Sequence, residues 1–269
     1  MNYLQQLQKV YPPGEARAVW RTLMDVRFGL SHADLLLGKD KKLSATAQAE
    51  LEILVARLLD GEPIQYVLGQ ADFCGRTFRV APGVLIPRPE TAELVQLVGS
   101  GTGRLLDVGT GSGCIAVTLA LAGWNVTAID ISPRALEIAR GNAEALGADV
   151  RLLHEDILHP APSDELWDVI VSNPPYVTRS EQAGMHRNVL HYEPHEALFV
   201  PDSDPLLFYR AVLDYARTHL NRGGSLYFEI NSAYGLEIQQ LLTEAGYTGV
   251  EILKDSDRKV RFAKAKKAP

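Results

Sequence analysis

The chain has 269 residues, a length that allows one large domain or two of ordinary size. Its 46% apolar and 22% charged residues are typical of a soluble globular protein. The net charge of −6 argues against a protein that holds duplex DNA through many phosphate contacts, because such proteins usually carry a basic face or a basic domain.

The residues that could hold a metal ion or a disulfide are few and widely spaced. Cys74 and Cys114 are too far apart for a zinc knuckle and too few for a disulfide framework, and the seven histidines show no HExxH spacing. We therefore expect no metal site. The sequence shows no signal peptide and no apolar span of about 18 residues, so it predicts a cytoplasmic protein that binds no membrane.

Residues 1–70 are predicted to form a small helical bundle. Apolar residues recur at helical spacing between Leu51 and Leu59, Ser44 can cap that helix, and Gly61 follows its end. The segment holds no catalytic constellation, so we expect it to dock a substrate or to pack. Residues 71–93 are rich in glycine, proline and aromatic residues, and they are predicted to form a hairpin and a hinge.

Strands and helices alternate from residue 94 to residue 269, which predicts a catalytic domain of the α/β class with a doubly wound parallel sheet. Two extended runs at the end lack a helix between them, so we expect a seven-stranded, mostly parallel sheet with an antiparallel edge pair. The expected strands are 104–108, 126–129, 150–153, 169–171, 225–230, 249–253 and 259–263, and the expected helices are 114–122, 133–145, 205–220 and 234–245.

A glycine-rich turn joins the first of these strands to the first helix. It reads Asp107-Val108-Gly109-Thr110-Gly111-Ser112-Gly113, and its glycines allow a ligand to approach the backbone closely. Asp130 ends the next strand, where a carboxylate can bind ribose hydroxyls, and Asp156 ends the one after and could face an adenine amine.

The spacing of these glycines separates two classes of cofactor. It is G-x-G-x-G and not the G-x-G-x-x-G of dinucleotide sites, and Asp107 would sit badly beside a pyrophosphate. The same carboxylate can engage the cationic amino-acid end of S-adenosylmethionine. We therefore predict an S-adenosylmethionine site, the alternative being a turn that binds nothing.

The tetrapeptide Asn173-Pro174-Pro175-Tyr176 follows the fourth expected strand. Proline makes such a loop stiff and extended, and it leaves carbonyl groups free to accept hydrogen bonds. The Asn173 side-chain oxygen and the Pro174 carbonyl could accept the two protons of a planar NH₂ group while Tyr176 covers its plane. An ordinary turn is the alternative. Next to a methyl donor, the tetrapeptide predicts methylation of an adenine amine or of a glutamine or asparagine side chain.

Three longer motifs carry a resemblance to a known family. They are Gly61-Glu62-Pro63-Ile64-Gln65-Tyr66-Val67-Leu68-Gly69, Phe73-x-Gly75-x-x-Phe78-x-Val80 and Val84-Leu85-Ile86-Pro87-Arg88-Pro89-Glu90-Thr91. Together with the glycine-rich turn and the tetrapeptide, they resemble the peptide chain release factor glutamine methyltransferases, the PrmC/HemK family. The resemblance covers nearly the whole chain and is weakest over the first 40 residues. It implies the class I, Rossmann-like methyltransferase fold behind an N-terminal helical domain.

The resemblance also implies a reaction. A methyl group would pass from S-adenosylmethionine to the side-chain amide of the glutamine in the Gly-Gly-Gln motif of class 1 release factors, with S-adenosylhomocysteine as the second product. The alternatives are an adenine-N6 nucleic-acid methyltransferase, which the acidic balance disfavours, and a non-catalytic scaffold. By position, the implied cofactor residues are Gly109, Thr110, Gly111, Ser112, Gly113, Asp130, Ile157 and Asn173, and the implied substrate residues are Asn173, Pro174, Pro175 and Tyr176.

Four further residues have open roles. Arg88 and Glu90 could pair with each other in the hinge, or they could line the acceptor pocket. Glu229, at the end of the fifth strand, could be structural or face the pocket, and we favour the structural role. Glu193 lies in a family stretch that we expect to form a loop over the active site. The turn at residues 254–258 is shorter than the family pattern.

Overall fold

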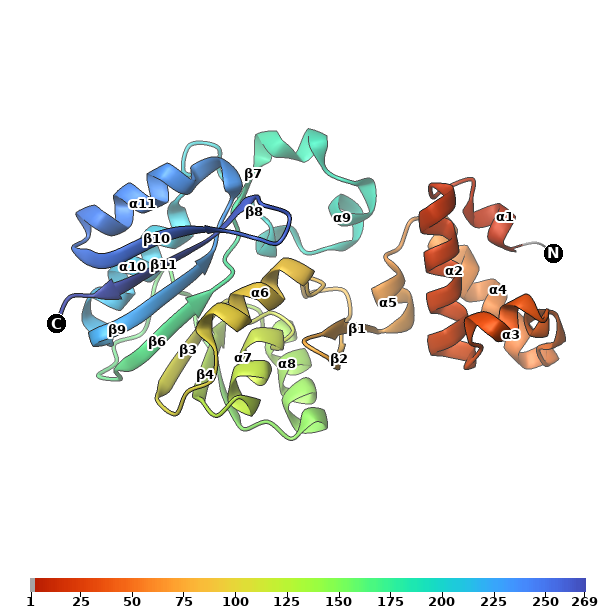
Figure 1. The fold of residues 1–269 in the computed structure, drawn as a ribbon, viewed down its shortest axis with the longest axis horizontal. Coiled ribbons are helices and arrows are strands. Elements are labelled where there is room, and N and C mark those ends of the chain that lie inside the picture. Colours follow the sequence, from red (N-terminus) through yellow and green to blue (C-terminus); the bar gives the residue numbers. More distant parts are fainter. Residues whose placement is uncertain (1–2) are drawn as a thin grey trace. The chain divides into compact units, whose positions relative to one another are not determined.

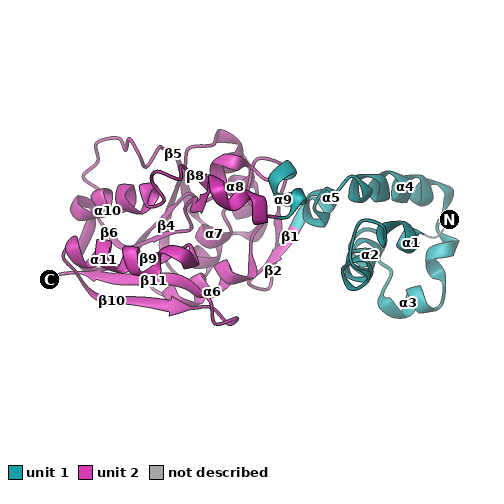
Figure 2. Cartoon of the chain, turned by 90° about the horizontal axis from the view of Figure 1, so that it is seen from above, with its two compact units in different colours: residues 1–70, 186–192 teal, residues 71–185, 193–269 magenta. Residues whose placement is uncertain are grey.

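The structure is a computed structural model, and it describes residues 3–269. The chain divides into two compact units, coloured separately in Figure 2. Unit 1 contains the residues up to Gln70 together with 186–192, and unit 2 contains 71–185 and 193–269. Within residues 3–269, no helix is long and apolar enough to cross a membrane.

Unit 1 is helical. Its helices, labelled in Figure 1, are α1 (Tyr3–Leu7), α2 (Pro13–Phe28), α3 (His32–Leu36), η1 (Lys39–Lys42), α4 (Ala45–Leu59), α5 (Ile64–Leu68) and α9 (Arg187–Tyr192). As predicted, the Ser44 hydroxyl caps α4 by accepting the Ala47 N–H, and the apolar face of the helix is buried. The sequence did not indicate that α9 groups with these helices. Its Tyr192 hydroxyl donates a hydrogen bond of 2.8 Å to the Asp60 carboxylate.

The segment predicted as a hairpin and hinge begins with two short strands, β1 (Gln70–Phe73) and β2 (Arg76–Arg79). Cys74 and Gly75 between them both have positive φ, as a two-residue hairpin loop requires. The buried side chain of Asn142 accepts the Arg79 N–H and donates to the Arg79 carbonyl. This contact ties the hairpin to unit 2, with which residues 71–93 are grouped.

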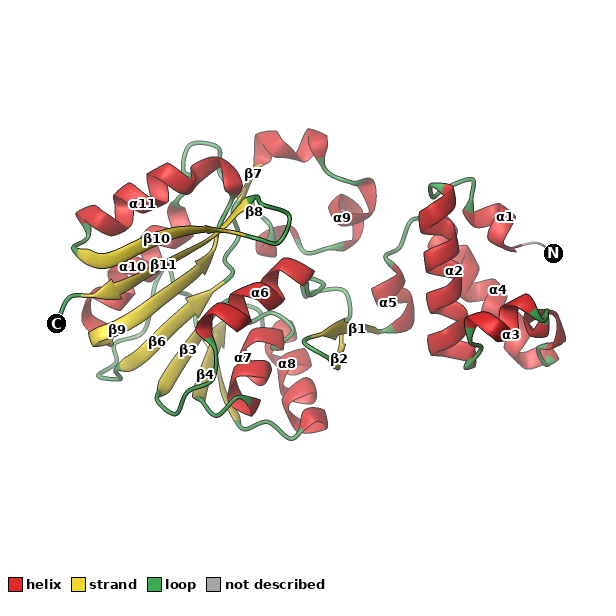
Figure 3. Ribbon diagram, in the orientation of Figure 1, coloured by secondary structure: helices red, strands yellow, loops and turns green. Residues whose placement is uncertain are grey.

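The centre of unit 2 is a seven-stranded sheet with the order β10-β11-β9-β6-β3-β4-β5 (Figure 3). Strands β9, β6, β3, β4 and β5 are parallel, and β11 runs antiparallel to both of its neighbours, β9 and the edge strand β10. The predicted mostly parallel sheet is therefore confirmed. The strands are β3 (Arg104–Val108), β4 (Asn125–Asp130), β5 (Val150–His154), β6 (Trp167–Ser172), β9 (Leu220–Glu229), β10 (Tyr247–Lys254) and β11 (Val260–Lys267).

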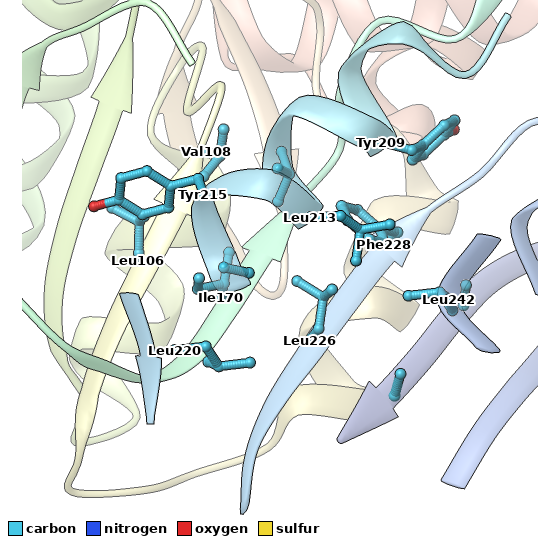
Figure 4. Close-up of a cluster of buried hydrophobic side chains, with 14 of the residues drawn as sticks. Leu106, Val108, Ile170, Tyr209, Leu213, Tyr215, Leu220, Leu226, Phe228 and Leu242 are labelled. Atoms are coloured by element: carbon cyan, nitrogen blue, oxygen red, sulfur yellow. The ribbon is translucent and has the colours of Figure 1, made fainter. Parts of the chain in front are cut away.

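Helices cover both faces of this sheet, and each face has its own apolar core. One core joins α10 and α11 to the strands, and Figure 4 shows Tyr209, Leu213 and Leu242 packed over Ile170 and Phe228. The other joins α6, α7 and α8 to the opposite face. The helices of unit 2 are α6 (Pro89–Val98), α7 (Cys114–Leu121), α8 (Pro133–Leu146), α10 (Leu207–His219) and α11 (Gly235–Glu244), with short turns η2 (Arg179–Gly184), η3 (His195–Ala197) and η4 (Ser232–Tyr234).

Two features lie beside this core. The two-residue strands β7 (Val177–Thr178) and β8 (Phe199–Val200) pair in parallel just after the tetrapeptide. The short turn before β11 is held by Asp255, whose carboxylate accepts the Lys259 N–H and the Arg261 side chain. The last hairpin therefore closes although its turn is shorter than the family pattern.

Candidate functional site

A cavity of about 240 Å³ lies within unit 2, at the edge where the parallel strands β3, β4, β5 and β6 end. Ligands of open α/β sheets bind at this carboxyl edge. Eight of the predicted cofactor residues line the cavity: Gly109, Thr110, Gly111, Ser112, Asp130, Asp156, Ile157 and Asn173. Pro174, Pro175 and Arg88 line it as well. The tertiary structure thus brings the glycine-rich turn and most of the tetrapeptide together.

The three glycines of the turn have different surroundings. All three have positive φ, a conformation that glycine adopts without steric cost. A Cβ at Gly109 or Gly111 would meet nothing within 4 Å, so the backbone there faces open space in the cavity wall. A Cβ at Gly113 would stand 3.0 Å from the Ala139 Cβ of α8, and Gly113 does not line the cavity. Gly113 therefore has a packing role against α8, and its contact with the cofactor stays a prediction.

Asp107 also lies elsewhere than predicted. Its side chain is fully buried and does not line the cavity, so it does not present a carboxylate to a ligand there. One oxygen accepts a 2.7 Å hydrogen bond from the Thr110 hydroxyl, and the other has no partner among the described residues. Burial raises the pKa of Asp107 to about 7. The observed contact holds the glycine-rich turn through Thr110.

Asp130 reaches the cavity from the end of β4. Its two carboxylate oxygens accept the backbone N–H groups of Gly111 at 2.8 Å and Ser132 at 2.9 Å, which fixes the carboxylate against the turn. Burial raises its pKa. Each oxygen keeps further acceptor capacity for a ligand hydroxyl. Asp156 follows β5, and its carboxylate accepts the N–H of Leu158. The neighbouring Ile157 forms an apolar part of the cavity wall.

Asn173 and the prolines follow β6. Ser172, which is buried, donates from its hydroxyl to the Val108 carbonyl at 2.8 Å and locks the end of β6 to the end of β3. Asn173 then donates from Nδ2 to the Thr91 hydroxyl oxygen at 3.1 Å. No described residue donates to Asn173 Oδ1. The amide oxygen is therefore available as an acceptor beside Pro174.

Tyr176 does not line the cavity. Its ring packs against the apolar core, and its hydroxyl donates to Glu229 at 3.0 Å. Burial raises the pKa of this hydroxyl above its usual value. The predicted stacking of Tyr176 on the acceptor group has no support in this placement. Glu229 is itself buried and also accepts the Thr91 hydroxyl at 2.7 Å, in agreement with the structural role favoured from the sequence.

Of the two roles left open for Arg88 and Glu90, the ion pair between them does not form. Arg88 pairs with Glu193 at 2.6 Å, and the second Glu193 oxygen accepts the Ile86 N–H at 3.1 Å. The Glu193 side chain is 1% exposed and that of Arg88 33%. The buried Glu193 carboxylate therefore fixes Arg88 in the cavity wall. Glu90 does not line the cavity.

Sequence reasoning assigned no role to three residues around the cavity. Thr91 and Ser172 stand within or next to motifs that were singled out, and that position was their only signal. Asn142 had none. Its Nδ2 donates to the Ser112 carbonyl as well as to the β2 strand, which joins the hairpin to the glycine-rich turn. Among residues 3–269, no group of three or more His, Cys, Asp or Glu side chains could hold a metal ion.

Two family models match the chain. The methyltransferase small domain matches residues 90–195, and the PrmC N-terminal domain matches residues 2–69. Among solved structures, a methyltransferase from Pyrococcus furiosus is 20% identical with a TM-score of 0.54, and it covers 84% of this chain and 100% of its own. The T. thermophilus 16S rRNA N2 G1207 methyltransferase, solved with AdoMet and guanosine, is 20% identical with a TM-score of 0.53, over 74% of this chain and 49% of its own. Both show a shared fold.

Curated relatives are much closer in sequence. The release factor glutamine methyltransferase of Bacteroides thetaiotaomicron is 49% identical over 97% of this chain and 96% of its own length. That of Flavobacterium psychrophilum is 38% identical over 97% and 96%, and that of Enterococcus faecalis 40% over 81% and 80%. With such similarity along nearly its whole length, the chain belongs to the release factor glutamine methyltransferase family.

Proposed function

We propose that this enzyme transfers a methyl group from S-adenosylmethionine to the side-chain amide of the glutamine in the Gly-Gly-Gln motif of class 1 release factors. The observation that carries the proposal is the position of Asn173. It lines the same cavity as the glycine-rich turn, its Nδ2 is committed to Thr91, and its Oδ1 is left as an acceptor. The names of the relatives support release factors as the substrate class.

The residues present fit S-adenosylmethionine. Gly109 and Gly111 offer open space where a Cβ would stand, and Asp130 holds a fixed carboxylate at the end of the next strand. The residues that would hold the cofactor are Gly109, Thr110, Gly111, Ser112, Asp130, Asp156, Ile157 and Asn173. When bound, the cofactor supplies an electrophilic methyl group on a sulfonium.

Asn173 and Pro174 would act on the acceptor amide. An amide nitrogen is a poor nucleophile because its lone pair is conjugated with the carbonyl group. Asn173 Oδ1 and the Pro174 carbonyl would accept its two N–H groups and orient the nitrogen, which supplies the proximity contribution. They would also stabilise the positive charge that develops on that nitrogen in the transition state. The methylated nitrogen is acidic enough to lose its proton to water, so no strong general base is needed.

The remaining predicted substrate residues have indirect places in this mechanism. Pro175 lines the cavity and keeps the tetrapeptide extended. Arg88 would shape the acceptor wall through its pair with Glu193. We propose a docking role for residues 1–70 and a cytoplasmic location, both of which fit a substrate of the translation machinery.

The test is methyl transfer from labelled S-adenosylmethionine to a purified class 1 release factor. The comparison substrates are the same factor without its Gly-Gly-Gln glutamine and a duplex DNA. Label on the intact factor alone is the expected result, and label on DNA would support an adenine methyltransferase instead. Asn173→Ala should lower kcat by about 100-fold or more while cofactor affinity stays within about threefold. Full activity in that variant would contradict the mechanism.

A further inference from the structure

The half-buried Asn173 and the buried Thr91 and Glu229 form a hydrogen-bonded chain that leads away from the cavity. Strands β6 and β9 are parallel neighbours with Ser172 opposite Phe228, so Asn173 and Glu229 are adjacent at the carboxyl edge of the sheet. Thr91, in the first turn of α6, lies between them. It donates to Glu229 at 2.7 Å and accepts from Asn173 Nδ2 at 3.1 Å. Thr91 is 3% exposed and Glu229 2%, so the hydrogen bond between them is shielded from water, and the bond from Asn173 to Thr91 is partly buried.

We infer that Thr91 and Glu229 are positioning residues that hold the Asn173 amide in the one orientation that presents its oxygen to the acceptor nitrogen. The inference deepens the proposed function and rests on it. Glu229 does not line the cavity, and Thr91, which does, is 3% exposed and gives its hydroxyl proton to Glu229. Both act through Asn173, whose amide could otherwise present either its oxygen or its NH₂ group.

The direction of each hydrogen bond follows from the chemistry of the groups. An ionised carboxylate only accepts, so the single Thr91 hydroxyl proton is committed to Glu229. The Thr91 oxygen then has only lone pairs to offer, and it can hold the NH₂ end of Asn173 but not the oxygen end. A flipped amide would bring two oxygens together with no proton between them and leave a buried acceptor unpaired.

The contacts of the Glu229 carboxylate oxygens are those of an acceptor, as this chain requires. Burial raises the pKa of Glu229, and hydrogen bonds from Thr91 and Tyr176 and the charge of Arg261 limit that rise. The Tyr176 hydroxyl occupies the second carboxylate oxygen at 3.0 Å. Tyr176 therefore supports the chain through its hydrogen bond to Glu229. This contact explains why its side chain does not line the cavity.

Thr91→Val tests the inference because it removes the hydroxyl and keeps the shape. Its kcat should fall about tenfold or more while S-adenosylhomocysteine affinity stays within about threefold, and Thr91→Ser should restore kcat to within about threefold of wild type. Tyr209→Phe is the matched control. It deletes a buried hydroxyl that donates to the Glu229 backbone carbonyl at 3.3 Å and not to any of the three side chains of the chain. It should leave kcat within about twofold.

A double variant separates positioning from a merely structural role. If Thr91 acts through Asn173, adding Thr91→Val to Asn173→Ala should cost no further activity. Equal kcat in wild type and Thr91→Val, with Asn173→Ala impaired, would overturn the inference and leave the proposed function standing. A wild-type enzyme that labels no release factor would instead overturn the proposed function.

If the wild-type enzyme labels no release factor, a measurement that does not depend on activity still decides the inference. In protein labelled with ¹⁵N-asparagine, the Asn173 side-chain signal is identified by its loss in Asn173→Ala. Its hydrogen exchange should be at least about tenfold slower in wild type and Thr91→Ser than in Thr91→Val. Equal exchange in all three proteins would show that Thr91 does not hold the amide.

Discussion

Replacing Gly109 by alanine should have two effects, one on stability and one on cofactor binding, which a matched control can separate. The first is conformational, because Gly109 has φ of +76° and an alanine is strained there. The second is local, because the new Cβ would enter the open space of the cavity wall. Gly147→Ala is the matched control. Gly147 has φ of +68°, meets nothing within 4 Å and ends α8 away from the cavity lining.

The structure sets the size of both effects. A left-handed alanine costs about 1–2 kcal/mol, so both variants should lose that much unfolding free energy, or about 2–8 °C in Tm. Only Gly109→Ala should also weaken cofactor binding. Its Cβ stands where the ligand would contact the protein backbone. We therefore expect Kd to rise at least about tenfold, equivalent to about 1.4 kcal/mol.

Thermal unfolding measures the first effect, and calorimetric titration with S-adenosylhomocysteine measures the second. Binding by Gly109→Ala within about twofold of wild type would refute the argument that this glycine permits close backbone approach. A similar loss of binding in Gly147→Ala would show that strain alone, and not the new Cβ, weakens the site.

Two further predictions concern buried charges. Because burial raises the pKa of Asp107 to about 7 from 3.8, the folded state alone is protonated between these values. The unfolding free energy should therefore fall as pH rises through this window, by at most about 4 kcal/mol, and urea unfolding should show no such contribution in Asp107→Asn. A wild-type curve parallel to that of the variant would contradict the buried titration. Arg88→Met leaves Glu193 buried without its partner and should cost about 1–3 kcal/mol in urea unfolding, a loss that adding Glu193→Gln should partly reverse. An unchanged midpoint in Arg88→Met would show that the pair contributes nothing.

The strands were readable from the sequence because parallel strands buried on both faces are continuous apolar runs. Strand β3 has the predicted bounds, Arg104–Val108. Strand β9 begins at Leu220, five residues before the predicted start at 225. The sequence did not indicate this start because Asn221, Gly223 and Gly224 do not form an apolar run. Helix α6 was not predicted, since its first turn lies in a proline-rich motif that indicated a hinge.

The candidate site was predicted in its composition but not in its connections. The sequence by itself determined the glycine-rich turn, the carboxylates at successive strand ends and the tetrapeptide, because each depends on local chain geometry. Only the tertiary structure decided that Arg88 pairs with Glu193, that Gly113 packs on α8, and that Asp107 is buried. It also decided that Thr91 joins Asn173 to Glu229. These contacts join side chains far apart in the sequence, and no local pattern specifies which distant partner the packed sheet and its helices bring within hydrogen-bond distance.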